Sequence, residues 1–87
     1  MSDYEVILGH YGEESQMLKA IEEMGELTSV LIRWLRDDDR VNRDDVITEI
    51  ADVSIMIEQL MYIFGKLAVE DEIIYKLMRT KERINEV

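Results

Sequence analysis

Apolar side chains return at helical spacing along two long stretches of the chain. Between Glu13 and Arg36 they recur every three or four residues, which predicts an amphipathic helix. Its apolar positions are Met17, Ala20, Ile21, Met24, Leu27, Leu31 and Leu35. The mostly polar residues 37–42 interrupt the pattern and predict a connection, after which a second long helix is expected to run to about Phe64.

Capping residues mark the expected helix starts. Ser2 and Glu5 have the spacing of a capping box, which predicts a short helix that ends near Gly12. Asn42 is a favourable N-cap for the long helix that follows it, and the acidic residues 44 and 45 complement the dipole of its first turn.

Gly65 suits the position just after a helix C-terminus, so the long helix is expected to end there. A fourth helix is predicted from about Val69. The acidic residues 70–72 then lie in its first turn and the basic residues Lys76, Arg79, Lys81 and Arg83 lie later, which is the order that the helix dipole favours. Proline is absent and glycine occurs four times, a composition that favours helices over strands and their turns.

These patterns predict an all-α fold, a single domain over residues 1–87 in which about four helices form an antiparallel helical bundle. The second long helix is apolar on nearly every side, and a small chain has little surface with which to cover it. The residues off its main apolar face are Ile55, Met56, Tyr62 and Ile63. We therefore expect homo-oligomerisation, as a homodimer or a homotetramer, to complete the bundle.

The chain carries a strong negative charge. It has 20 acidic and 10 basic residues, so its formal net charge is -10. This balance argues against nucleic acid and against anionic membranes as partners, because both attract basic surfaces. Cysteine is absent, which excludes disulfides and thiolate metal sites and, with the lack of a long apolar run, favours a cytoplasmic protein.

Two pairs of acidic residues lie inside the apolar stripes of the long helices. Glu23 and Glu26 are three residues apart, so they project from one face of their helix, and Glu49 and Asp52 repeat this spacing on the next helix. Helices joined by a short connection pack antiparallel, which would bring the four carboxylates together. Such a cluster calls for a hard divalent cation, Mg²⁺ first and Mn²⁺ as an alternative. Solvated helix faces are the other interpretation of the same acids.

These acids carry a family resemblance. The segment from Glu22 to Glu26, then 22 residues, then the segment from Glu49 to Asp52, resembles the EExxE…ExxD signature of MazG-like nucleoside triphosphate pyrophosphohydrolases. This family belongs to the all-α NTP pyrophosphatase superfamily, and the resemblance covers about residues 10–85. It implies hydrolysis of a nucleoside triphosphate to the monophosphate and pyrophosphate with Mg²⁺. The Mg²⁺ ligands that it implies are Glu23, Glu26, Glu49 and Asp52, with Glu22 as a residue that positions the attacking water.

The resemblance also implies contacts to the substrate itself. Lys76, Arg79 and Arg83 recur along one face of the last predicted helix and match the family's phosphate-binding positions; pairing with nearby acids at the surface is the alternative. Gln16 and Trp34 lie roughly on the face of Glu23 and are candidates to contact the base or ribose. The alternatives are that the glutamine is part of the polar surface and that the tryptophan packs in the core or at a dimer contact.

Two further functions stay open. Phosphoribosyl-ATP is an alternative substrate within the same superfamily. A non-catalytic helical oligomerisation or adaptor module would explain the apolar second long helix, although it leaves the acids within apolar stripes unexplained. Thermal stabilisation by Mg²⁺ separates a metal-dependent enzyme from such a module, because a ligand that binds only the folded chain raises its stability.

Overall fold

The computed structural model describes residues 1–86, and these form four helices and no strand. The helices are α1 (Asp3–Tyr11), α2 (Glu13–Leu35), α3 (Arg43–Phe64) and α4 (Lys66–Asn85). The all-α prediction is therefore confirmed for the described residues. The bounds of the first three helices agree with those expected from the apolar spacing and the caps.

The capping box predicted at Ser2 is present, and the N-cap predicted at Asn42 is part of a second capping box. The Ser2 hydroxyl accepts a hydrogen bond from the backbone N–H of Glu5, and the Glu5 carboxylate accepts one from the N–H of Ser2. Asn42 and Asp45 exchange the same two bonds at the start of α3. These bonds satisfy backbone donors that have no partner within the helix, and so they fix where each helix begins.

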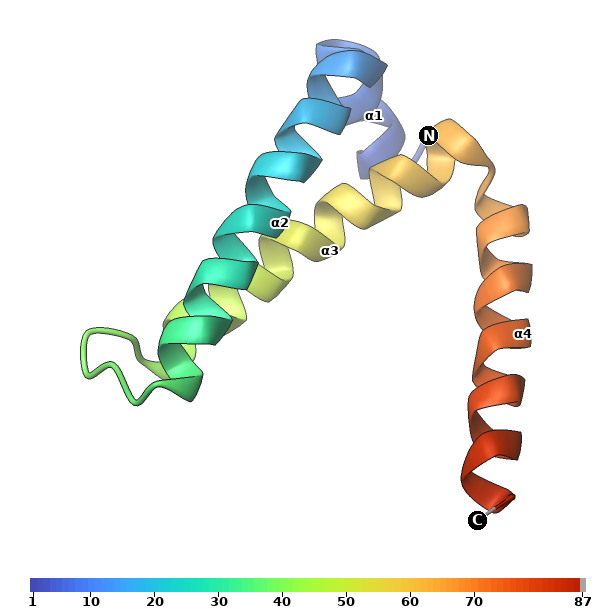
Figure 1. Ribbon diagram of the computed structural model, residues 1–87. Coiled ribbons are helices and arrows are strands. Elements are labelled where there is room, and N and C mark those ends of the chain that lie inside the picture. The colour runs from blue at the N-terminus through green and yellow to red at the C-terminus, as the bar shows by residue number, and fades with distance from the viewer. Residues whose placement is uncertain (87) are drawn as a thin grey trace.

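The two long helices α2 and α3 are antiparallel, extend to the same side of the loop that joins them, and pack against each other (Figure 1). They diverge with distance from the loop, and α1 contacts both of them at the wide end (Figure 1). The buried apolar side chains of this three-helix unit come mainly from the α2–α3 contact, with one from the loop. They are Ala20, Val30, Val41, Met56 and Met61.

The face of α2 that is buried differs from the one that its apolar spacing suggests. Residues 16, 20, 23 and 30 of α2 are buried, and two of these are polar. Most of the apolar residues whose spacing predicted the helix lie on its exposed sides instead; Ile21 is 64% exposed and Leu35 is 80% exposed. Helical spacing predicts the helix correctly but does not show which of two apolar stripes meets α3.

The start of α4 was predicted wrongly. It begins at Lys66 rather than near Val69, because Gly65 adopts a φ of 113° and its carbonyl accepts the N–H of Val69 at 3.0 Å, which closes a helical turn at once. The acidic residues 70–72 consequently lie in the second turn, and the first turn holds no acid.

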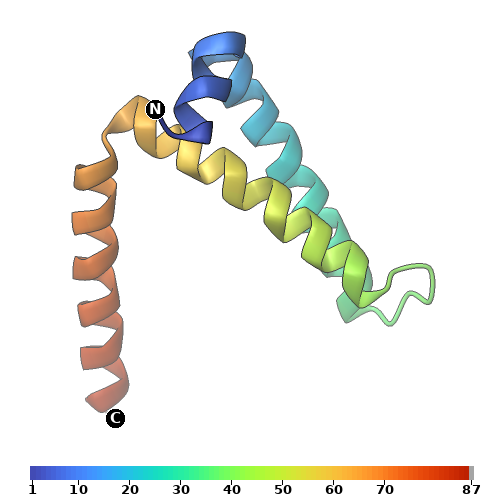
Figure 2. The ribbon, with the colours of Figure 1, turned by 180° about the vertical axis from the view of Figure 1, so that it is seen from behind.

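Helix α4 leaves the other three helices as a separate arm (Figures 1 and 2). Among the helices it contacts α3 alone. The radius of gyration of the Cα atoms is 16.1 Å, against about 12 Å for a compact domain of this length. The predicted bundle is thus three packed helices and one projecting helix, and a four-helix bundle does not close within one copy of the described chain.

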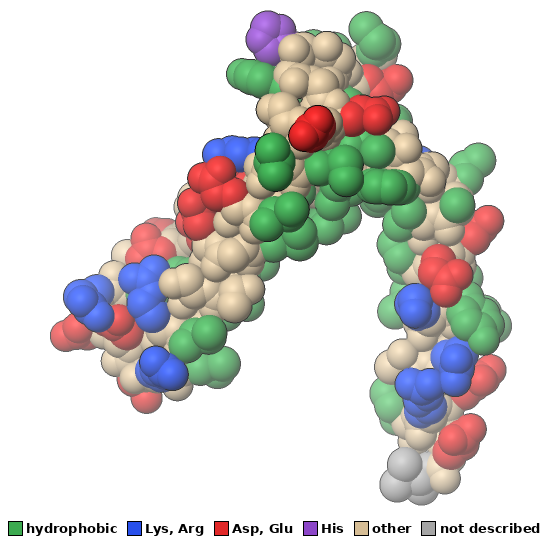
Figure 3. Space-filling model, turned by 45° about the horizontal axis from the view of Figure 1, so that its top comes forward, with side chains coloured by type: hydrophobic (Ala, Val, Ile, Leu, Met, Phe, Trp, Pro, Cys, Tyr) green, Lys and Arg blue, Asp and Glu red, His purple; other side chains and the backbone are tan. Residues whose placement is uncertain are grey.

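The projecting arm leaves many apolar side chains uncovered. Figure 3 shows hydrophobic side chains on the surface of both arms, several of them on the sides that face the gap. On α4 the exposed ones are Leu67, Ile73, Ile74, Tyr75, Leu77, Met78 and Ile84. None of the described helices combines the length and the apolar character that crossing a bilayer requires.

Candidate metal centre

Three carboxylates from two helices meet where α2 packs against α3. Glu23 comes from α2, and Glu49 and Asp52 come from α3; one oxygen from each lies within 4.8 Å of the others. The spacing of three residues puts the two α3 acids on one face, and the antiparallel contact sets Glu23 opposite them. The structure therefore brings together three of the four acids singled out in the sequence.

This acidic cluster is partly removed from water. Glu23 is only 7% exposed, and Glu49 and Asp52 are half-buried. The Oε2 atoms of Glu23 and Glu49 are both buried without a hydrogen-bond partner. A buried acceptor left without a partner costs about 1–3 kcal/mol, and more when it is charged. Two such oxygens beside a third carboxylate form a ligand set that is suited to a cation.

Glu26, the fourth predicted ligand, lies beside the cluster on the exposed side. The pKa of Glu26 is raised, chiefly because its carboxyl group shares a hydrogen bond with that of Glu23, then because of repulsion from Glu23, some burial and the charge of Glu49. The carboxyl groups of Glu26 and Glu23 therefore interact. The ligand atom of Glu26 does not belong to the close group of three in this structure.

Lys19 is the cation next to these acids, and the sequence analysis missed it. Its Nζ lies 3.1 Å from Oε1 of Glu23 and 3.8 Å from Oε1 of Glu22. The pKa of Lys19 is raised, first by its hydrogen bond to Glu23 and then by the charges of Glu22 and Glu23. The spacing of four residues between Lys19 and Glu23 was the available signal, since side chains so spaced meet on a helix.

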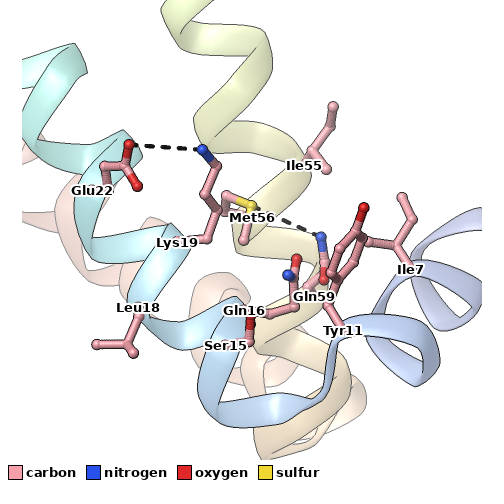
Figure 4. A pocket seen from close by; sticks show the side chains of 10 residues that line it. All are labelled: Ile7, Tyr11, Ser15, Gln16, Leu18, Lys19, Glu22, Ile55, Met56 and Gln59. Carbon is pink, nitrogen blue, oxygen red and sulfur yellow. Dashed lines mark hydrogen bonds and ion pairs between the residues drawn. The ribbon is translucent and has the colours of Figure 1, made fainter.

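Two cavities adjoin the cluster along the α2–α3 contact. The larger, of about 640 Å³, lies among α1, α2 and α3, and both Lys19 and Glu22 line it (Figure 4). The smaller, of about 280 Å³, lies toward the loop and is lined by Glu49 and by Arg33 and Arg40. Arg40 is held by Asp38 through a 2.8 Å ion pair. Arg33 makes no ion pair with the described residues.

The remaining predicted site residues are spread over the molecule. Gln16 is buried and lines the larger cavity, whereas Trp34 lies near the loop end of α2 and lines only small hollows there. Lys76, Arg79 and Arg83 are exposed on α4, the helix that contacts α3 alone. Lys76 is 3.9 Å from Glu72, and Arg79 lies over the ring of Tyr75. One copy of the chain does not bring these three cations to the acidic cluster.

Magnesium fits the donor set. It prefers carboxylate oxygens, takes few of them, and leaves other positions for water or phosphate. Glu23, Glu49 and Asp52 offer such oxygens, and no histidine or cysteine that would favour a softer metal joins them. Comparisons with protein-family models, curated proteins and solved structures gave no significant match. The resemblance to MazG-like enzymes therefore rests on the motif residues themselves.

Proposed function

We propose that this chain is a Mg²⁺-dependent nucleotide pyrophosphohydrolase of the MazG-like type, acting in the cytoplasm on nucleoside triphosphates. The products would be the nucleoside monophosphate and pyrophosphate. The observation that carries the proposal is the convergence of Glu23, Glu49 and Asp52, with two of their buried oxygens left without partners. Mn²⁺ is the alternative metal.

The three clustered acids would hold the metal, and Glu26 is placed to join them. When bound, the divalent cation supplies charge that offsets both the carboxylates and the polyphosphate, polarises phosphoryl oxygens and acidifies water. Three fixed negative charges beside a polyphosphate would otherwise repel it. The role of these acids would therefore be to bind the cation next to the phosphates of the substrate.

Other side chains near the cluster have roles that follow from their positions. Glu22 lines the larger cavity and is exposed, so its carboxylate can orient water or accept a proton from it. Lys19 offers a positive charge between that cavity and Glu23. On the other side of the cluster, Arg33 lies in the smaller cavity, where it can contact phosphate oxygens.

We propose that the working unit is a homodimer or a homotetramer. Residues 1–65 hold 15 acids and 5 bases, whereas residues 66–87 hold 5 of each. The outer half of α4 carries Lys76, Arg79 and Arg83 together with exposed apolar side chains. No other part of the same chain covers these cations or these apolar side chains. Packing α4 on the α2–α3 arm of a second copy would cover apolar surface and bring these cations toward the partner's acids.

Release of pyrophosphate tests the proposed reaction. Purified chain is incubated with a panel of NTPs, dNTPs and phosphoribosyl-ATP, with Mg²⁺ or with EDTA, beside the variant Glu49→Gln. We expect release only with Mg²⁺ and a loss of about a hundredfold or more in the variant. Glu14→Gln, which changes an exposed acid at the start of α2, is the matched control. The proposal would be refuted if Glu49→Gln released pyrophosphate at the wild-type rate, or if the folded wild type released none from any substrate.

Mixing two inactive variants tests whether α4 serves a second copy. One variant is Glu49→Gln, and the other replaces Lys76, Arg79 and Arg83 with Gln. If α4 supplies its cations to the partner, each mixed dimer has one intact site, and random mixing restores about a quarter of the wild-type sites. No recovery, although sedimentation shows mixed dimers, would place the cations and the acids of one site in the same chain.

A further inference from the structure

The larger cavity is lined by a buried amide whose oxygen has no partner in the fold. Gln59 of α3 is 1% exposed, and its Oε1 has no hydrogen-bond partner. Its Nε2 donates only to the sulfur of Met56, at 3.8 Å, and a thioether is a weak acceptor. Buried side-chain amides normally find partners, so an unpartnered one at a cavity wall indicates a ligand that supplies them.

The walls around Gln59 suit a flat heterocycle. Gln16 of α2 is also buried, at 6% exposed, and lines the same cavity, while Ile7, Tyr11 and Ile55 supply apolar and aromatic surface (Figure 4). The cavity volume of about 640 Å³ lies within the range of roughly 300–1,000 Å³ found for small-molecule sites. A carboxamide presents one acceptor next to one donor, which is complementary to the hydrogen-bonding edge of a nucleobase.

The cavity also adjoins the acidic cluster. Lys19 lines the cavity, and its Nζ is 3.1 Å from Oε1 of Glu23, so one side chain spans the distance between cavity and cluster. A nucleotide with its base against Gln59 would therefore direct its phosphates past Lys19 toward Glu23.

We infer that the cavity among α1, α2 and α3 binds the nucleobase of the substrate, and that the Gln59 carboxamide reads its hydrogen-bonding edge. The ligand class rests on the proposed function, whereas the cavity and the unpartnered amide oxygen do not. The base must offer an N–H to Oε1 of Gln59 and an acceptor to its Nε2. Gln16 faces the same space from α2 and is the second amide available to that edge.

Binding of nucleosides without metal tests this inference apart from catalysis. Adenosine, guanosine, cytidine and uridine are titrated separately into the ¹⁵N-labelled chain in EDTA, and the side-chain amide resonances of Gln59 and Gln16 are followed by NMR. We expect at least one nucleoside to shift both resonances saturably. We expect Gln59→Leu, which keeps the size of the side chain and removes the unpartnered oxygen, to weaken that binding at least tenfold without lowering the Tm. Ser54→Ala, at an exposed position of the same helix, is the control and should bind as the wild type does.

The outcomes separate this inference from the proposed reaction. Saturable shifts that Gln59→Leu weakens support the base site, whether or not pyrophosphate is released from any nucleotide. Pyrophosphate release with an unchanged KM in Gln59→Leu would support the reaction and overturn the base site. Absence of any shift at Gln59 with all four nucleosides would also overturn it.

Discussion

Glu49→Gln tests the metal centre through stability alone, because the substitution should act in opposite directions with and without metal. An oxygen of Glu49 lies within 4.8 Å of oxygens of both Glu23 and Asp52. At that distance and an effective dielectric constant of about 20, two unit charges repel by on the order of 3 kcal/mol. Solvent at the half-buried positions and relaxation of the side chains reduce this, so we expect the neutral amide to stabilise the metal-free chain by about 1 kcal/mol.

The amide adds a second favourable term. Its N–H can donate to the Oε2 of Glu23, which has no partner in the wild-type chain. In EDTA the variant should therefore melt about 4–8 °C above the wild type. With Mg²⁺ at about a hundred times its Kd, the wild type gains about 2.7 kcal/mol. The variant lacks one ligand and gains little, so the order of the two melting temperatures reverses.

Thermal unfolding followed by circular dichroism, in EDTA and in MgCl₂ series, measures both halves of this prediction. A KCl series of equal ionic strength controls for screening of the net charge of -10, and Glu14→Gln controls for the loss of any one acid. The reasoning fails if Glu49→Gln melts below the wild type in EDTA, since the cluster would then be stabilising without metal. It also fails if Mg²⁺ raises the two melting temperatures equally.

Three more predictions concern the acid beside the cluster and the ends of the helices. The pKa of Glu26 is raised in the folded chain, so its stabilising effect is full below the unfolded pKa and is lost as the pH rises through the folded pKa. In EDTA, Glu26→Gln should therefore flatten the fall of Tm as the pH rises above the ordinary pKa of a glutamate, and an unchanged slope would contradict this. Asn42→Ala removes the side-chain cap of α3 and should lower the free energy of unfolding in urea by about 1 kcal/mol. Asn42→Asp keeps a capping side chain and should retain most of the wild-type stability. Gly65→Ala places a Cβ at a φ of 113° and should cost about 1 kcal/mol or more; a wild-type urea midpoint would show that the α3–α4 junction does not need this conformation.

The sequence predicted the elements well because local signals determine them. The capping box at Ser2 and the N-cap at Asn42 act within four residues, and the structure places both helix starts where these signals predict. The start of α4 was missed because no residue near 66 signals a helix. There a positive φ at Gly65, rather than a side chain, begins the helix.

The candidate site was predictable only in part, because its members depend on packing. The spacing of the acids predicted that Glu23 would face Glu49 and Asp52, and the structure brings these three together. It did not predict that Glu26 would lie outside the close group, nor that Gln59 would be buried without a partner for its oxygen. Those facts depend on the angle between α2 and α3 and on the place of α1, which no short pattern in the chain encodes.

The polar residues in the buried interface argue that it was selected for more than stability. Three of its buried positions, Gln16, Glu23 and Gln59, carry polar side chains, and two of these have an unpartnered oxygen. Apolar side chains of similar size would hold α2 and α3 together at least as well. Exposed apolar residues are plentiful on the same helices, so the composition of the chain did not require polar groups here. Buried polar groups without hydrogen-bond partners are expected where a ligand binds. All three residues lie at the acidic cluster or in the cavity next to it.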